Sequence, residues 1–193
     1  MLQVSERKVL SIIIPAYNEE GSIGVILKKL CSVELCADIV KELVIVNDCS
    51  NDQTEARILE FHQENPGLKI KYLRHEVNQG KGASIHTGIR VASGNFIIVQ
   101  DADLEYDPRE YNLLLKPILE GFADVVYGSR FLGGNAHRIL FFWHTIGNKL
   151  LTFTSNMFTN LNLSDMETCY KLFKADVLKN IVLERKDLAL SLK

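Results

Sequence analysis

Short apolar runs alternate with amphipathic segments along the first hundred residues. The apolar runs, which are predicted as strands, cover residues 9–14, 42–46, 69–73 and 95–100. Helical spacing of apolar residues follows the first three runs, over about 22–30, 54–62 and 83–91. Nearly continuous apolar strands that alternate with helices predict an α/β fold, in which helices cover both faces of a mostly parallel sheet.

A polar loop follows each of these four predicted strands. The loops cover residues 15–19, 47–52, 78–82 and 101–105. Open parallel sheets bind ligands at the carboxyl ends of their strands, near the point where the strand order reverses. We therefore expect the four loops to converge on one crevice. Alternatively, each loop is an ordinary turn or helix cap, since Asn, Asp, Ser and Gly favour such positions.

The fourth loop carries two carboxylates directly after a buried-strand pattern. In an extended segment, side chains at i and i+2 leave the same face, so Asp101 and Asp103 could reach one ion. Mg²⁺ and Mn²⁺ are hard cations that bind through one or two carboxylates together with substrate phosphates. The pair is therefore predicted to hold a divalent metal, with a solvated acidic turn as the alternative.

Composition narrows the class of protein. The 193 residues are 47% hydrophobic and carry a formal net charge of −2, which suits one globular domain and gives no basic patch for nucleic acid. Residues 1–20 lack a signal-peptide core, and no apolar run approaches the ~18 residues of a membrane span. The chain is expected to be soluble or peripheral, in the cytoplasm. Reduced thiols are expected for the cysteines, which lack zinc or CxxC spacing: Cys31, Cys36, Cys49 and Cys169.

Six motifs in order resemble the family 2 glycosyltransferases of the GT-A fold, over about residues 9–184. The motifs are IPAYNEE at 14–20, VNDCS at 46–50, NQGKG at 78–82 with Gly88, DADLE at 101–105, GSR at 128–130 and DMETCYK at 165–171. The chain is most similar to the branch that makes dolichyl-phosphate and polyprenyl-phosphate sugars. The five histidines have no mutual metal spacing and receive no role.

This resemblance implies metal-dependent, inverting transfer of a sugar from a UDP- or GDP-sugar donor. It implies Asp101 and Asp103 as catalytic residues and as ligands of Mg²⁺ or Mn²⁺, with Glu105 as a third ligand. The donor is expected to contact seven residues: Pro15, Ala16, Tyr17, Glu19, Asp48, Lys81 and Ala102. Core packing is the alternative for Tyr17, and a glycine turn that caps a helix is the alternative for the Lys81 segment.

The resemblance also implies an acceptor phosphate on a polyprenyl lipid. Arg130, which follows a predicted strand at 124–127, would bind it together with Arg138 and Lys171, since a guanidinium can bind phosphate bidentately. For Arg130 the alternative is a surface arginine. A sugar hydroxyl acceptor would instead need a general base, for which Asp165 is the candidate, with a turn cap as its alternative. Two further functions stay open: transfer to a polysaccharide or other hydroxyl acceptor, and an inactive nucleotide-sugar-binding remnant.

Aromatic and apolar residues at 139–144 and 150–153 have two interpretations. Core packing is favoured, and an interfacial helix at the cytoplasmic face of a membrane is the alternative. The chain departs from the family at about residue 185, where an RFGFEPE-like stretch is expected. Codons for residues 186–193 can be chosen so that a shifted frame encodes that stretch, so we expect a truncation or frameshift of the single domain there.

Overall fold

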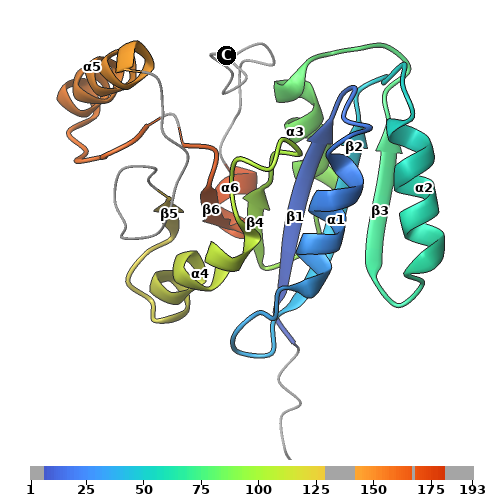
Figure 1. The fold of residues 1–193 in the computed structure, drawn as a ribbon. Helices are drawn as coiled ribbons and strands as arrows, with labels where there is room; N and C mark the ends of the chain where they lie inside the picture. The colour runs from blue at the N-terminus through green and yellow to red at the C-terminus, as the bar shows by residue number, and fades with distance from the viewer. Residues whose placement is uncertain (1–6, 129–141, 167, 181–193) are drawn as a thin grey trace, which may run out of the picture.

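Six strands form one sheet in the order β3-β2-β1-β4-β6-β5 (Figure 1). The computed structural model describes residues 7–128, 142–166 and 168–180, without the side chains of 142–144. The strands are β1 Val9–Ala16, β2 Val40–Asn47, β3 Lys69–Arg74, β4 Phe96–Val99, β5 Val125–Tyr127 and β6 Lys171–Lys174. The helices are α1 Ile23–Ser32, α2 Thr54–Glu64, α3 Lys81–Val91, α4 Tyr111–Leu119, α5 Phe142–Thr159 and α6 Ala175–Asn180, with a 3-10 turn at Pro108–Glu110.

The first four strands are parallel, and the predicted α/β architecture is confirmed. From β1 the chain builds outward to β2 and β3, and then returns to place β4 on the other side of β1. The strand order therefore reverses between β1 and β4, where open sheets form their ligand crevice. β6 is antiparallel to both β4 and β5.

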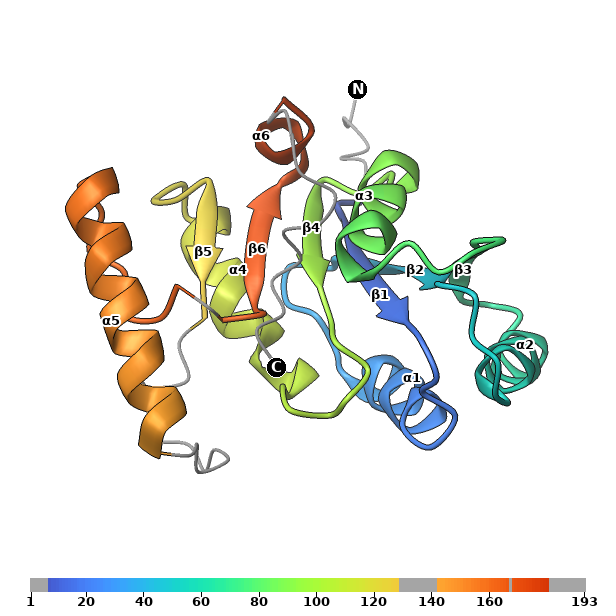
Figure 2. The ribbon, with the colours of Figure 1, turned by 90° about the horizontal axis from the view of Figure 1, so that it is seen from above.

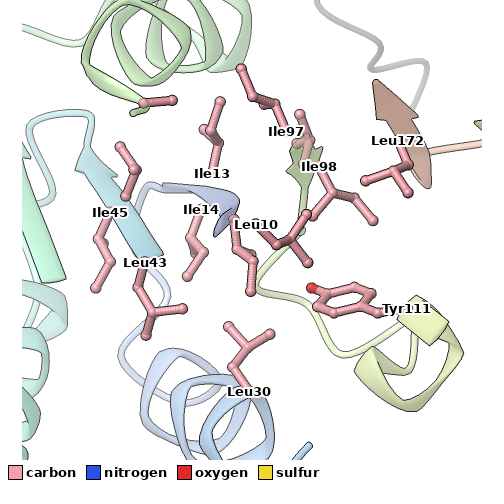
Figure 3. Close-up of a cluster of buried hydrophobic side chains, with 14 of the residues drawn as sticks. Leu10, Ile13, Ile14, Leu30, Leu43, Ile45, Ile97, Ile98, Tyr111 and Leu172 are labelled. Carbon is pink, nitrogen blue, oxygen red and sulfur yellow. The ribbon is translucent and has the colours of Figure 1, made fainter. Parts of the chain in front are cut away.

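The core lies on both faces of the central strands. In Figure 2, α3 and α6 cover one face, and α1, α2 and α4 cover the other. Figure 3 shows Ile13 directed toward α3, and Leu10 and Ile14 directed toward α1 and α4. All three side chains are fully buried, which explains why these strands are apolar at consecutive positions.

A buried carboxylate joins the amino ends of the strands. Glu42, fully buried in β2, accepts hydrogen bonds from Ser11 Oγ at 2.5 Å, Ser93 N at 2.8 Å and Ser93 Oγ at 2.7 Å. Lys69 and Lys71 each place Nζ 3.0 Å from Oε1. Burial by itself raises the pKa of Glu42, but these donors hold that pKa well below its usual range. Glu42 therefore stays ionised and links three strands.

Helix α5 lies beyond β5, at the edge of the sheet far from β3 (Figures 1 and 2). Leu150 and Phe153 are 64% and 66% exposed, whereas Asn148 and Thr152 are buried. The expectation of core packing for 150–153 was therefore wrong, because the polar face of α5 makes the hydrogen bonds to the protein. Residues 139–141 lie outside the described part of the chain. Among the described helices, none is both long and apolar enough to cross a membrane.

Candidate functional site

The loops after β1 and β2 are joined at the carboxyl edge of the sheet. Backbone N–H groups of each loop donate to side chains of the other: Asn18 N to Ser50 Oγ at 3.0 Å, Glu19 N to Thr54 Oγ1 at 2.7 Å, Asn51 N to Asn18 Oδ1 at 2.9 Å and Gln53 N to Glu20 Oε2 at 2.9 Å. Polar residues that resemble separate turns in the sequence thus fix two loops as one unit.

Asp48 connects the loop after β2 to the loop after β3. Asp48 is 2% exposed, and its carboxylate accepts hydrogen bonds from Gln79 N at 2.9 Å and Gly80 N at 2.7 Å. His75 Nδ1 lies 2.6 Å from Asp48 Oδ1. Asp48, which was predicted to contact the sugar donor, is therefore hydrogen-bonded within the protein, where it fixes the loop before Lys81.

Lys81 connects the loop after β3 to the loop after β4. Its Nζ lies 2.7 Å from Asp101 Oδ1, and 27% and 15% of the two side chains are exposed. Burial lowers the pKa of Lys81, but the attraction of Asp101 and Asp103 outweighs it and raises that pKa above its usual value. Lys81 is the first residue of α3, so its charge adds to the positive end of the helix dipole. The predicted convergence of the four loops is confirmed.

The loop of Asp101 and Asp103 is a turn rather than the extended segment expected. β4 ends at Val99, and Leu104 has a φ of 64°. Asp103 is exposed and its Oδ1 accepts a hydrogen bond from Glu105 N at 3.0 Å, which closes the turn. In the described parts of the chain, no three Asp, Glu, His or Cys side chains are grouped so as to hold a metal on their own. The three predicted ligands therefore form no protein-only metal cage.

A buried network of hydrogen bonds supports the turn that carries Asp101 and Asp103. The carbonyl oxygen of the Gln100 side chain accepts hydrogen bonds from Tyr111 OH at 2.6 Å and Tyr170 OH at 2.8 Å, while Gln100 Nε2 donates to Asp101 O at 3.0 Å. Burial raises the pKa of both tyrosines far above the usual value, so they remain hydrogen-bond donors. Sequence reasoning missed Gln100, Tyr111 and His75. Only Tyr170 lay in a recognised motif, at 165–171.

The remaining predicted donor contacts lie along the same edge. Tyr17 is 46% exposed, so its alternative role in core packing was wrong. Ala16 and Ala102 are buried, and Pro15 is half-buried. The Glu19 carboxylate accepts a hydrogen bond from Ser22 Oγ at the start of α1.

On the predicted acceptor side, the described residues are Asp165 and Lys171. Asp165 is 1% exposed and its Oδ1 accepts a hydrogen bond from Asn148 Nδ2 at 2.8 Å. Lys171 is 8% exposed, with Nζ 5.2 Å from the centre of the Tyr127 ring. Arg130 and Arg138 lie outside the described residues.

Known proteins share this sequence pattern and fold. Residues 11–182 match the family described as glycosyl transferase family 2. The dolichol-phosphate mannosyltransferase of Pyrococcus furiosus is 30% identical over 125 residues, which cover 65% of this chain and 34% of that protein. The dodecaprenyl-phosphate galacturonate synthase of Rhizobium johnstonii is 24% identical over 174 residues, which cover 90% of this chain and 50% of that protein.

A solved structure confirms the expected GT-A architecture. The mannosyltransferase PcManGT of Pyrobaculum calidifontis, in complex with GDP-Man and Mn²⁺, has a TM-score of 0.67 at 17% identity, over 95% of this chain and 49% of that one. At this identity the likeness concerns the fold alone. The chain spans between about a third and two thirds of the lengths of the curated relatives that it matches.

Proposed function

Because the chain belongs to glycosyl transferase family 2, we propose that it transfers a sugar, with inversion, from a UDP- or GDP-sugar to the phosphate of a polyprenyl lipid. The observation that carries the proposal is the Lys81–Asp101 pair at the switch point of the sheet, with Nζ and Oδ1 2.7 Å apart. The pair brings a cation suited to a diphosphate, and a carboxylate suited to a metal, to one point.

Mg²⁺ or Mn²⁺ fits this set of residues. Such ions bind through one or two protein carboxylates and complete their coordination with substrate phosphates and water, so no third protein ligand is required. Asp101 and Asp103 would hold the ion, with Glu105 as a further proposed ligand. When bound, the metal neutralises the charge that develops on the leaving nucleoside diphosphate. Lys81 would contact the same phosphates.

The exposed ring of Tyr17 supports a base-binding role, because an exposed aromatic side chain in the loop after β1 can pack against a nucleotide base. The backbone at Pro15 and Ala16 would lie along the base, and the Glu19 carboxylate would accept hydrogen bonds from the base or from the ribose. Asp48, whose buried carboxylate already accepts hydrogen bonds from Gln79 and Gly80, would reach the nucleotide through its remaining acceptor capacity. The small side chain of Ala102 leaves space beside the two aspartates.

The surroundings of Asp165 favour a lipid phosphate over a hydroxyl acceptor. A hydroxyl must lose its proton to a base, but Asp165 is buried and accepts a hydrogen bond from Asn148. A phosphate oxygen is already anionic and needs cations instead, which Arg130, Arg138 and Lys171 would provide. The two named relatives, by their names, make lipid-linked sugars of this kind.

Helix α5 supports a position at a lipid bilayer, and the face we propose is the cytoplasmic one. Leu150, Phe153, Met157 and Phe158 are at least 63% exposed. The helix contains no acidic residue and carries the exposed Lys149, so an anionic lipid surface would not be repelled. The opposite face is bonded to Asp165, where the proposed acceptor segment begins. The apolar face would thus bring the acceptor side to the membrane.

Metal-dependent nucleotide binding tests the donor half. We expect UDP or GDP with Mn²⁺ to raise the melting temperature of the wild-type chain, since a ligand at 100 times its Kd stabilises by about 2.7 kcal/mol. Asp101→Asn combined with Asp103→Asn should abolish that shift, while Asp176→Asn, an exposed site on α6, should leave it intact. An unchanged shift in the double variant would refute the metal assignment.

Vesicle sedimentation and acceptor assays test the lipid half. Leu150→Asp combined with Phe153→Asp should abolish binding to phosphatidylglycerol vesicles, whereas Leu113→Asp, 65% exposed on α4, should not. Binding retained by the α5 variant would contradict the bilayer surface, and a dimer lost in that variant would instead assign α5 to a second copy. Transfer to a soluble sugar but not to polyprenyl phosphate would favour a hydroxyl acceptor. Donor binding without any transfer would indicate an inactive binding protein.

A further inference from the structure

His75 is held from both sides of its ring, directly after β3. The residue is 8% exposed, and its backbone N donates to Asn47 O at 2.9 Å. Nδ1 lies 2.6 Å from Asp48 Oδ1 and Nε2 lies 3.0 Å from Thr87 Oγ1 on α3. Because a carboxylate only accepts hydrogen bonds, Nδ1 must carry a proton. The ring therefore has one orientation, which is set by the loop after β2 on one side and by α3 on the other.

Asp48 passes this constraint to the next loop. Its two oxygens accept hydrogen bonds from the backbone of Gln79 at 2.9 Å and of Gly80 at 2.7 Å. Gly80 has a φ of 87°, a conformation that glycine adopts without strain, and α3 begins at the next residue, Lys81. The position of the Lys81 side chain therefore depends on two backbone N–H groups that Asp48 holds.

We infer that His75 is a positioning residue for the donor site: it orients the Asp48 carboxylate, which in turn sets the loop that directs Lys81 toward the donor diphosphate. The inference rests on the proposed function for its ligand, and on these hydrogen bonds and the Lys81–Asp101 ion pair for its geometry. Groups that touch a substrate need supporting hydrogen bonds to stay in place, and a buried carboxylate that loses a donor reorients to find another. Without His75, Oδ1 of Asp48 would keep only the N–H of Gln79.

Two substitutions separate the hydrogen bond from the bulk of the ring. His75→Ala removes the donor to Asp48, whereas His75→Asn puts a side-chain N–H₂ close to where Nδ1 lies. Exchange of the Gln79 and Gly80 amide hydrogens, followed by NMR without ligand, reports the loop directly. Titration calorimetry with UDP or GDP in the presence of Mn²⁺ reports the consequence for the donor.

We expect His75→Ala to speed exchange at Gln79 and Gly80 about tenfold and to weaken nucleotide affinity about tenfold, as for loss of a hydrogen bond to a charged group. His75→Asn should restore most of both. Glu42→Gln, which lowers stability at the other end of the sheet, and His62→Ala on α2 should change neither.

Unchanged exchange at these two amides in His75→Ala, or a His75→Asn variant that behaves like His75→Ala, would overturn the inference. Faster exchange with unchanged nucleotide affinity would also overturn it, because the loop would then not serve the donor. If the wild-type chain binds neither nucleotide, the proposed function fails, while amide exchange still decides whether His75 orders the loop.

Discussion

Carboxylates lie at both ends of the parallel sheet, but their surroundings differ. At the amino ends of the strands, Glu42 is fully buried and receives hydrogen bonds from two serines and ion pairs from two lysines. At the carboxyl ends, Asp101 has Lys81 as its ion-pair partner and Asp103 is exposed. The first arrangement leaves no capacity for a ligand, whereas the second leaves carboxylate oxygens free to take one. The number of hydrogen bonds and ion pairs that a carboxylate already makes within the protein thus distinguishes one that holds strands together from one with capacity for a ligand.

The lysines at the two ends differ in the same way. Lys69 and Lys71 lie on β3, and among the described residues both form their ion pair with the same buried acid, Glu42. Lys81 lies at the start of α3, at the carboxyl edge of the sheet, where the proposed donor diphosphate would compete with Asp101 for its ammonium group. The ion pairs of Glu42 would therefore stabilise the fold permanently, whereas Lys81 would exchange Asp101 for the diphosphate when the donor binds.

The largest effect is expected for Glu42→Gln, which should lower the free energy of unfolding by about 3 kcal/mol. The amide removes the charge and turns an N–H₂ group toward donors, so buried hydrogen bonds are lost. Urea unfolding measures the change. Nucleotide affinity below the melting temperature should stay the same, and a parallel loss of affinity would break the distinction between the two ends.

Lowering the pH should gradually remove the contribution that ionised Glu42 makes to the free energy of unfolding. Because the donors depress the pKa of Glu42 in the folded state, its contribution is complete above about pH 5 and is lost as the pH falls toward the folded-state pKa. Between pH 7 and pH 3 the difference in unfolding free energy between wild type and Glu42→Gln should shrink by about 2 kcal/mol. A difference that grows on acidification would contradict this sign.

Much of this fold is readable from the sequence, because its strongest signals are local. Consecutive apolar residues in β1, β2 and β4 indicate strands that are buried on both faces, and the loops that follow them lie at one edge by geometry alone. Lys81 and Asp101 could therefore be placed together. The antiparallel pairing of β6 with β4 and β5 could not, because a strand of three or four residues carries no signal of its partner.

The missed features depend on contacts between distant residues. His75 and Asp48 are 27 residues apart in the chain, and nothing in either segment specifies the other as partner. The orientation of α5 has the same cause: a helical pattern shows that one face is apolar, but tertiary contacts such as Asn148 with Asp165 decide which face is inward. The turn at Asp101 and Asp103 depends on the positive φ of Leu104, which a non-glycine residue seldom signals.

Lys81→Gln tests whether the Lys81–Asp101 ion pair, unlike the pairs of Glu42, exchanges partners when a ligand binds. Removing the ammonium group frees Asp101, so affinity for Mn²⁺ alone should rise about fivefold, while affinity for UDP or GDP with Mn²⁺ should fall about tenfold. Calorimetric titrations of metal and of nucleotide measure the two changes. Lys116→Gln, an exposed site on α4, is the control. Changes of the same sign would show that Lys81 does not compete with the metal for Asp101.

The smallest effect is expected for Tyr111→Phe, because Tyr111 lies in the core beneath the carboxyl edge and is linked to Asp101 through Gln100. Tyr111 and Tyr170 both donate to Gln100, whose amide holds the backbone of Asp101. Loss of one hydroxyl should cost about 1 kcal/mol of stability, because Tyr170 still satisfies the Gln100 oxygen. Nucleotide affinity, measured by calorimetry, should change less than about twofold, since one remaining donor keeps the amide in place. A tenfold loss of affinity would instead make this buried network part of the binding site, and the carboxyl edge would then depend on the core beneath it as closely as the amino edge depends on Glu42.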